Sequence, residues 1–451
     1  MAAPSADRIF GRVSHPSVHS HGGHPSSVRV AFRARVIVVT ALAILGALTL
    51  AGVIALWPTG GPPAGETAAA KQFAGKGVTF SDAQIITIHD GCPQLFGSGG
   101  ASGKTGPGST QTCQTAKVRL LNGKGAGGGL TLPILWPYSD AGLQPGDHLR
   151  LTVTPTPKGQ VTSADAQNGA VGSTIGQSFS VFGIERNDPV IWWAIAFVVI
   201  VVAVGALRGL MAVIALALSG LMLFVFVVPA LIAGEPGFWV GLVASCGMMF
   251  IVLFLTHGIS MRTCAALLGT VGGIVITAGI AQLEVISTRL SGVGDEATGT
   301  ISTLTSAIDY RGLITCAIII SGLGVLNDIT VTQASAAWEL RAASPHMSRR
   351  TMFASAFRIG RDHIASSIYT IVFAYAGTGL AVLVVVSLYN RPALELLTHE
   401  DVATEVVRTL CSAIGLVLAM PITTAIAIAL LPAESLRHPT APAGQGYTVR
   451  V

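Results

Sequence analysis

Long apolar runs and polar stretches alternate along this chain. The first apolar run, Val36–Trp57, would extend about 33 Å as a helix, which is enough to cross a hydrocarbon layer of about 30 Å. The polarity then rises over residues 58–187, and apolar runs return over residues 188–432. The pattern therefore predicts one membrane helix at 36–57, a polar domain at 58–187 and a membrane bundle at 188–432.

The bundle contains further runs of membrane length. They are Val190–Leu207, Gly209–Ala233, Phe238–Thr256, Cys264–Ile286, Gly312–Trp338, Ala365–Tyr389 and Val406–Leu431. With the first helix they predict an α-helical polytopic bundle of about eight spans. A bundle of seven or nine spans is an alternative, because hydropathy places the ends of a span only to within several residues. Eight spans put every arginine-rich connection on one side, as the positive-inside rule requires. We therefore expect a disordered cytoplasmic tail at 1–35 and a second cytoplasmic tail at 433–451.

The polar domain has the pattern of a small β-fold. Lys117–Leu121 and His148–Thr154 alternate apolar and polar residues between turn-rich pieces, which is typical of half-buried strands. A barrel or a sandwich would fit, on the extracytoplasmic side. Cys92 and Cys113 are the cysteines of this region, and a disulfide between them is predicted to stabilise the domain by about 3 kcal/mol.

Composition supports the membrane assignment and limits the partners. Hydrophobic residues make up 51% of the chain and charged residues 11%, against about 25% charged in soluble domains. Every lysine lies between Lys71 and Lys158, and no basic stripe alternates with aromatics, so nucleic acid is not an expected partner. The expected partners are the lipid bilayer, with a small polar solute or ion; a homo-oligomer or a membrane partner stays open. The heavy use of Ala, Gly, Val and Arg suggests a bacterial plasma membrane.

One apolar run contains polar side chains at positions where a membrane span is expected to be apolar. Asp328 lies about 24 Å along a helix that begins near Gly312, and a charge at such depth costs about 2.5–3.5 kcal/mol on insertion scales. Asp328 and Thr332 share a helix face, and Glu284 is the acid of a neighbouring span. The residues predicted to line a polar path are Asn327, Asp328, Thr332, Gln333 and Glu284. The alternative is that Asp328 pairs with an inside arginine or helps to pack the bundle.

Catalytic and metal-binding motifs are absent from the sequence. It contains no HExxH, GxSxG, Walker or paired CxxC motif. We therefore expect no enzyme activity, no metal site and no cofactor.

Three blocks of sequence resemble one family. They are Leu253–Ile274 (LFLTHGISMRTCAALLGTVGGI), Gly322–Leu340 (GLGVLNDITVTQASAAWEL) and Phe357–Leu380 (FRIGRDHIASSIYTIVFAYAGTGL), and together they resemble the YibE/F family of bacterial multi-pass membrane proteins. The resemblance implies an integral membrane protein connected with transport. It draws attention to His257, Arg262, Arg361 and Asp362, which we interpret as an inside gate.

These patterns favour a permease or transporter-like protein that moves a small polar solute or ion past Asp328. The alternative is a membrane-anchored receptor, sensor or assembly partner that uses the β-domain. A membrane enzyme comes third.

Overall fold

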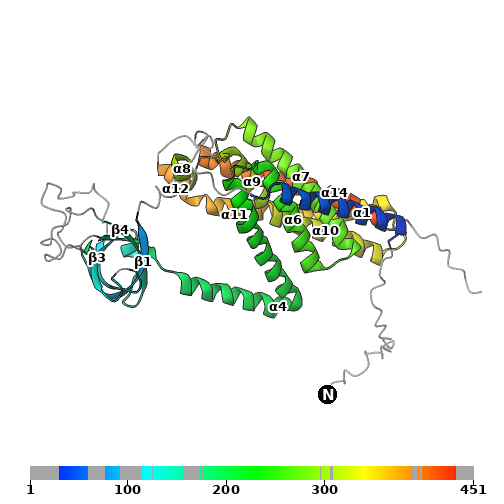
Figure 1. The fold of residues 1–451 in the computed structure, drawn as a ribbon. Coiled ribbons are helices and arrows are strands. Elements are labelled where there is room, and N and C mark those ends of the chain that lie inside the picture. Colours follow the sequence, from blue (N-terminus) through cyan, green and yellow to red (C-terminus); the bar gives the residue numbers. More distant parts are fainter. Residues whose placement is uncertain are drawn as a thin grey trace, which may run out of the picture.

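The computed structural model describes residues 30–58, 77–91, 113–123, 125–155, 173–174, 177–294, 296–304, 308–388, 395 and 399–432. A helical bundle and a separate β-sheet make up this part of the chain (Figure 1). Of the tail predicted at 1–35, residues 1–29 lie outside the described residues, and a helix begins at Phe32. The tail predicted at 433–451 lies wholly outside them. Cys92 lies outside them too, so its disulfide with Cys113 stays a prediction.

The β-sheet confirms that the polar domain is built of alternating strands. Its strands are β1 (Thr79–Asp90), β2 (Cys113–Leu120), β3 (Gly129–Leu135), β4 (His148–Pro155), β5 (Ser173–Thr174) and β6 (Gln177–Ile184). They pair antiparallel in the order β3-β2-β1-β4-β6-β5, and the sheet curls into a half-barrel rather than a sandwich (Figure 1). In β2, Ala116, Val118 and Leu120 are buried and alternate with exposed polar residues, as a half-buried strand requires.

The helices are mostly long and apolar. They are α1 (Phe32–Ala55), α4 (Asn187–Met222), α5 (Val228–Ile232), α6 (Gly237–His257), α7 (Met261–Ser287), α8 (Glu296–Leu304), α9 (Tyr310–Ser321), α10 (Leu323–Ala343), α11 (Arg349–Thr378), α12 (Leu380–Leu388) and α14 (Glu400–Leu430). Within the described residues, six stretches are long and apolar enough to cross a membrane: Phe32–Ala55, Asn187–Ile232, Gly237–His257, Met261–Ser287, Tyr310–Ala343 and Glu400–Leu430.

Two predicted spans fall within a single helical stretch. Asn187–Ile232 has 46 residues, about 69 Å of helix, which is more than twice the hydrocarbon thickness. The backbone leaves helical geometry at Ala206 (φ 49, ψ −134), and Figure 1 shows the sharp bend in α4. Arg208 follows this bend, so each arm has the length of one span.

The predicted span Ala365–Tyr389 differs from the structure. Its residues are divided between α11 and α12, and α11 begins much earlier, at Arg349. Ser348 caps that beginning, because its hydroxyl accepts a hydrogen bond from the Thr351 amide at 3.2 Å. Since α11 contains several charges, it is not among the six apolar stretches, and the number of eight spans stays a prediction.

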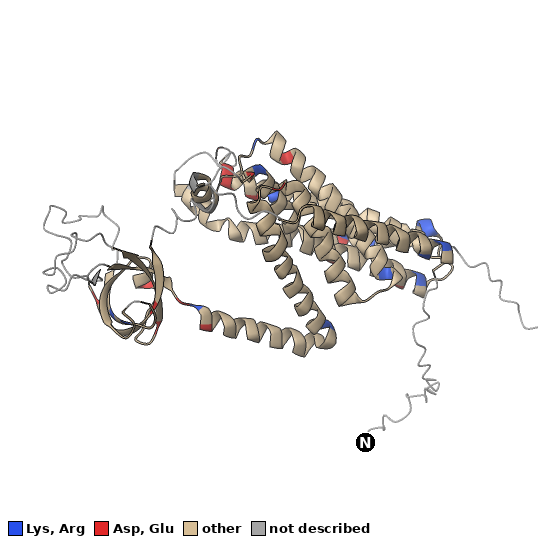
Figure 2. Ribbon diagram, viewed as in Figure 1, with Lys and Arg blue, Asp and Glu red and all other residues tan. Residues whose placement is uncertain are grey.

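Charge divides the bundle into two ends (Figure 2). Arginines gather where α6, α10 and α14 end and α7 and α11 begin, and we call this the arginine end. There Arg349, at the start of α11, donates a hydrogen bond to the Leu431 carbonyl after α14 at 2.9 Å. Acids gather at the opposite, acidic end. There the Glu400 carboxylate accepts from the Ser291 and Gly292 amides at 2.7 and 2.9 Å, joining α14 to the segment after α7.

Candidate functional site

The centre of the bundle holds a fully buried amide. Gln333 of α10 is 0% exposed, and its side-chain nitrogen donates to the Thr424 hydroxyl at 2.9 Å and to the Ala356 carbonyl at 3.2 Å. Its oxygen accepts from the Gly360 amide at 3.2 Å. Gln333 therefore joins α10 to α14 and α11 and has its donors occupied within the protein. The prediction that it lines a polar path did not anticipate this structural role.

Small residues let the neighbouring helices approach closely. A methyl group placed on Gly269 of α7 would collide with the Thr423 side chain of α14, and one on Gly415 of α14 would collide with Thr277 of α7. Close contact of this kind is how membrane helices gain packing energy without a hydrophobic driving force. These approaches form a closely packed seam between α7 and α14.

Asp328 lies on the opposite side of α10 from Gln333. Successive helical residues are about 100° apart, so the two side chains point about 140° away from each other. Asp328 is exposed, and within the described residues its carboxylate has neither a hydrogen bond nor an ion pair. Thr332 is half-buried one turn further along. Asn327 is half-buried too, and its Oδ1 is enclosed without a hydrogen-bond partner in the described part of the chain.

Asp328 lies near the middle of the bundle in depth. α9 and α10 form one stretch of 34 residues, Tyr310–Ala343, and Asp328 is about 27 Å from its start and about 22 Å from its end. A hydrocarbon layer of about 30 Å centred on this stretch would include Asp328 close to its midplane.

The structure does not bring Glu284 to Asp328. The Thr270 and Thr330 hydroxyls of α7 and α10 are 2.6 Å apart and set a common depth. From that depth Glu284 lies about 21 Å towards the acidic end and Asp328 only about 3 Å, so about 18 Å separates them along the bundle.

The residues of the predicted inside gate occupy two separate places. His257 ends α6 and Arg262 lies in the first turn of α7, both exposed at the arginine end. Arg361 and Asp362 are exposed in the middle of α11, about 18 Å from its start, and these two form no ion pair in the described structure. α11 continues through Asp362, so this residue lies inside the helix and not at its beginning.

The middle of α11 contributes a residue that the sequence reasoning missed. Ala356, Gly360, His363 and Ser367 recur at i, i+4, i+7 and i+11, so they form one face of α11. Ala356 and Gly360 of this face contact Gln333 of α10. His363 therefore lies on the side of α11 that faces α10, about one turn beyond the Gln333 contact, and it is exposed.

Asp328, Thr332 and His363 are polar residues beside the line of contact between α10 and α11, and we call this line of contact the α10–α11 groove. α10 and α11 run in opposite directions, and Gln333 and Gly360 mark the same depth. His363 lies about 4–5 Å from that depth towards the acidic end, and Asp328 about 7–8 Å in the same direction. The carboxylate and the imidazole are therefore at nearly the same depth on neighbouring helices. The signal available in the sequence was the repeat of Gly360 and His363 on one helix face.

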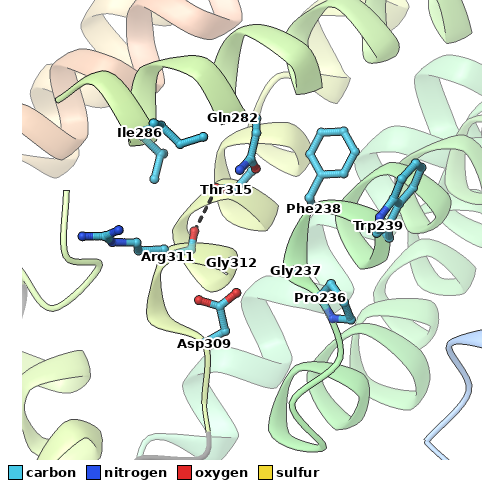
Figure 3. Close-up of a pocket in the computed structure, with 11 residues that line it drawn as sticks. Pro236, Gly237, Phe238, Trp239, Gln282, Ile286, Asp309, Arg311, Gly312 and Thr315 are labelled. Carbon is cyan, nitrogen blue, oxygen red and sulfur yellow. Dashed lines mark hydrogen bonds between the residues drawn. The ribbon is translucent and has the colours of Figure 1, made fainter. Parts of the chain in front are cut away.

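A cavity lies at the acidic end, where α6, α7 and α9 meet (Figure 3). It measures about 300 Å³, and Phe238, Trp239 and Ile286 supply apolar walls. Gln282 and Asp309 point towards its centre in Figure 3. Gly237 and Gly312 touch beside it, since a methyl group on either would collide with the backbone of the other. None of the predicted path residues reaches this cavity.

Metal ligands do not gather in the part of the chain that the structure describes. No group of three or more His, Cys, Asp and Glu side chains there could hold a metal ion. Cys246, Cys264, Cys316 and Cys411 are free thiols buried among the helices.

Six apolar helical stretches of membrane length in the described residues, together with two ends of different charge, define a polytopic α-helical membrane protein. The family model described as YibE/F-like protein matches residues 193–433, more than half of the chain. The chain belongs to the YibE/F-like family, as the sequence blocks predicted. The match takes in the bundle from α4 to α14 and leaves out α1 and the β-sheet. No curated protein and no solved structure matches the chain.

Proposed function

We propose that this protein is a permease or transporter-like protein of the bacterial plasma membrane. It moves a small polar solute or ion along the α10–α11 groove. Both termini are cytoplasmic in this proposal, and the β-domain is extracytoplasmic, where it gathers or gates the solute. The proposal includes no enzyme activity.

The observation that carries the proposal is the exposed carboxylate of Asp328. It lies at mid-depth, it has no partner among the described residues, and a charge facing lipid there would cost about 2.5–3.5 kcal/mol. Such residues face a hydrated space in most membrane proteins, and they mark the routes of ions and polar solutes. A mobile polar species beside α10 accounts for keeping the acid there.

Reconstituted vesicles test this proposal. The full chain is placed in liposomes, and uptake of monovalent cations, divalent cations, anions and protons is followed in turn. Asp328→Asn should lower the flux of the transported species by at least about tenfold, because it removes the charge and keeps the side-chain shape. Glu235→Gln, in the exposed turn before α6, is the matched control and should leave flux unchanged. Equal flux in the native protein and Asp328→Asn would refute the proposed path.

An aromatic patch on the β-sheet favours the alternative of a receptor or sensor. Phe80 and Phe182 are 47% and 58% exposed, with their ring centres 4.9 Å apart in an edge-to-face arrangement. The Arg150 guanidinium lies 5.7 Å from the centre of the Phe80 ring. Exposed aromatics beside a cation are common at binding surfaces. Deleting residues 58–187 distinguishes the two functions, since a receptor would lose all activity, whereas a transporter would retain measurable flux.

A further inference from the structure

The α10–α11 groove brings two groups that exchange protons in water to one depth of the membrane. The side chains are the Asp328 carboxylate and the His363 imidazole, and both are exposed. Neither forms a hydrogen bond or ion pair within the described residues. A carboxylate and an imidazole are both side chains that commonly take up and release protons in proteins.

The position of His363 follows from two contacts that the structure fixes. Gln333 of α10 accepts from the Gly360 amide and donates to the Ala356 carbonyl, both on α11. His363 shares the helix face of Ala356 and Gly360, so its side chain leaves α11 on the side next to α10. The ring remains exposed, so it opens into the space along the α10–α11 contact rather than into the packed interior.

Asp328 lies on α10 at nearly the depth of His363 and outside the packed face of its helix. The α10 face that packs inward includes Ile329, Thr330 and Gln333, all buried, and Asp328 lies outside that face. Thr332 is one turn further on the same side, half-buried, and places a hydroxyl between the depth of Asp328 and the arginine end. The groove thus offers a carboxylate, an imidazole and a hydroxyl in succession.

One other charged side chain near this depth can exchange a proton, the exposed carboxylate of Asp362. Asp362 neighbours His363 but lies about 100° away on α11, at the outer rim of the groove. Arg361 and Arg358 lie on other sides of α11, away from the Gly360 face, and stay charged at any physiological pH. On α10 the next acid, Glu339, is about 16 Å nearer the arginine end than Asp328. Where α14 packs against α10 and α11, near Gln333, its side chains are Met420 and Thr424, which carry no charge.

We propose that Asp328 and His363 together form a proton-binding site in the α10–α11 groove, so that H⁺ is the coupling ion. The inference rests on the proposed transport function for its biological meaning, and on geometry alone for the site. In each cycle a proton from water at one end of the groove binds the carboxylate or the imidazole nitrogen, and it leaves to water at the other end. No other bond forms or breaks.

Histidine NMR tests the site without any transport. The full chain carries ring-labelled histidine in detergent micelles or nanodiscs, and His363→Gln assigns the signal of this residue. Removing the neighbouring negative charge with Asp328→Asn should move the pH midpoint of the His363 signal downward by about half a pH unit or more, because a carboxylate stabilises the imidazolium form. The signal of His346, in the turn between α10 and α11, is the control and should not move. An unchanged His363 midpoint in Asp328→Asn overturns the proposal.

Proton flux tests the coupling. Liposomes with a pH-sensitive dye inside report proton entry when a pH gradient is applied. His363→Gln and Asp328→Asn should each lower proton flux at least about tenfold, whereas His346→Gln should leave it unchanged. Full proton flux in His363→Gln overturns the proposal, and so does solute flux that ignores the pH gradient.

The two measurements separate this inference from the proposed function. Coupled titration of His363 and Asp328 with no flux of any species supports the site and contradicts transport. Flux of a solute that depends on Asp328 but neither on His363 nor on pH supports transport and contradicts the proton site. A thermal unfolding midpoint near that of the native protein shows that each variant is folded.

Discussion

Neighbouring residues of α10 have opposite environments. Gln333 is buried, and α11 and α14 supply its hydrogen-bond partners. Asp328, little more than one turn away, faces outward without a partner among the described residues. A buried amide is stable only when its donors and acceptor are paired, and α14 and α11 supply the partners. An outward carboxylate at mid-depth is stable only beside water or another polar species. The same helix therefore contributes structure on one face and candidate function on the other.

Replacing Gln333 tests its structural role. Gln333→Leu keeps the approximate size of the side chain but removes the hydrogen bonds to Thr424, Ala356 and Gly360. Interhelical hydrogen bonds in membranes average about 0.6 kcal/mol each, so we expect a loss of about 1–2 kcal/mol in the free energy of unfolding. Thermal unfolding in detergent measures it. Gln282→Leu, a half-buried amide on α7 for which no hydrogen bond is seen in the described structure, is the control; a loss of equal size there would contradict the role of Gln333.

At the scale of elements, two features of the helices determine the arrangement of the bundle. α7 and α14 pack through glycines opposite threonines, which brings their backbones close together. α11 is a continuous helix from Arg349 that keeps its charged middle, Arg361 and Asp362, at the depth of Gln333. These two features place the α10–α11 groove beside the closely packed seam between α7 and α14.

Glycine substitutions on α7 should have effects of opposite sign. Gly269→Ala puts a methyl group into the Thr423 side chain of α14, so the helices must separate, and overpacking of this kind costs about 1–3 kcal/mol. Gly279→Ala, on the same helix, meets nothing within 4 Å and should be neutral or stabilise by up to about 1 kcal/mol through helix propensity. Unfolding midpoints of both variants in one detergent check this. Similar losses for the two would show that α7 and α14 do not pack as described.

The whole molecule has a consistent polarity. Arginines gather at one end of the bundle and most acids at the other, where Glu400 holds the segment after α7 (Figure 2). In the proposed orientation the arginine end faces the cytoplasm, as the positive-inside rule favours. The β-sheet follows the end of α1 opposite the arginines that begin that helix, so the same proposal puts it outside.

The lysines allow this orientation to be tested in the native sequence. Every lysine of the chain lies between Lys71 and Lys158, in the polar domain, and Lys117 of β2 is exposed. A membrane-impermeant amine reagent should therefore modify these lysines on intact cells to the same extent as on permeabilised cells. Mass spectrometry of the Lys117 peptide measures the extent. Modification that appears only after permeabilisation would place the domain in the cytoplasm and reverse the orientation.

The sequence by itself determined the membrane character, the strands at Lys117–Leu121 and His148–Thr154, and the family. Hydropathy and alternation act over a few neighbouring residues, and the bilayer thickness sets the length of a span, so local pattern is enough for these features. The sequence also singled out Asp328, because a lone acid in an apolar run is conspicuous whatever lies around it.

Only the tertiary structure decided what each polar residue does. It showed that Gln333 is bonded inside the bundle, that Glu284 lies far from Asp328, that Arg361 and Asp362 belong to the middle of a helix, and that His363 faces α10. These outcomes depend on which helices lie side by side and at what depth they meet. Contacts between residues far apart in the chain, such as Gly269 with Thr423, determine the neighbours and the depth. A helix face becomes an interior or a groove only when its neighbours are in place.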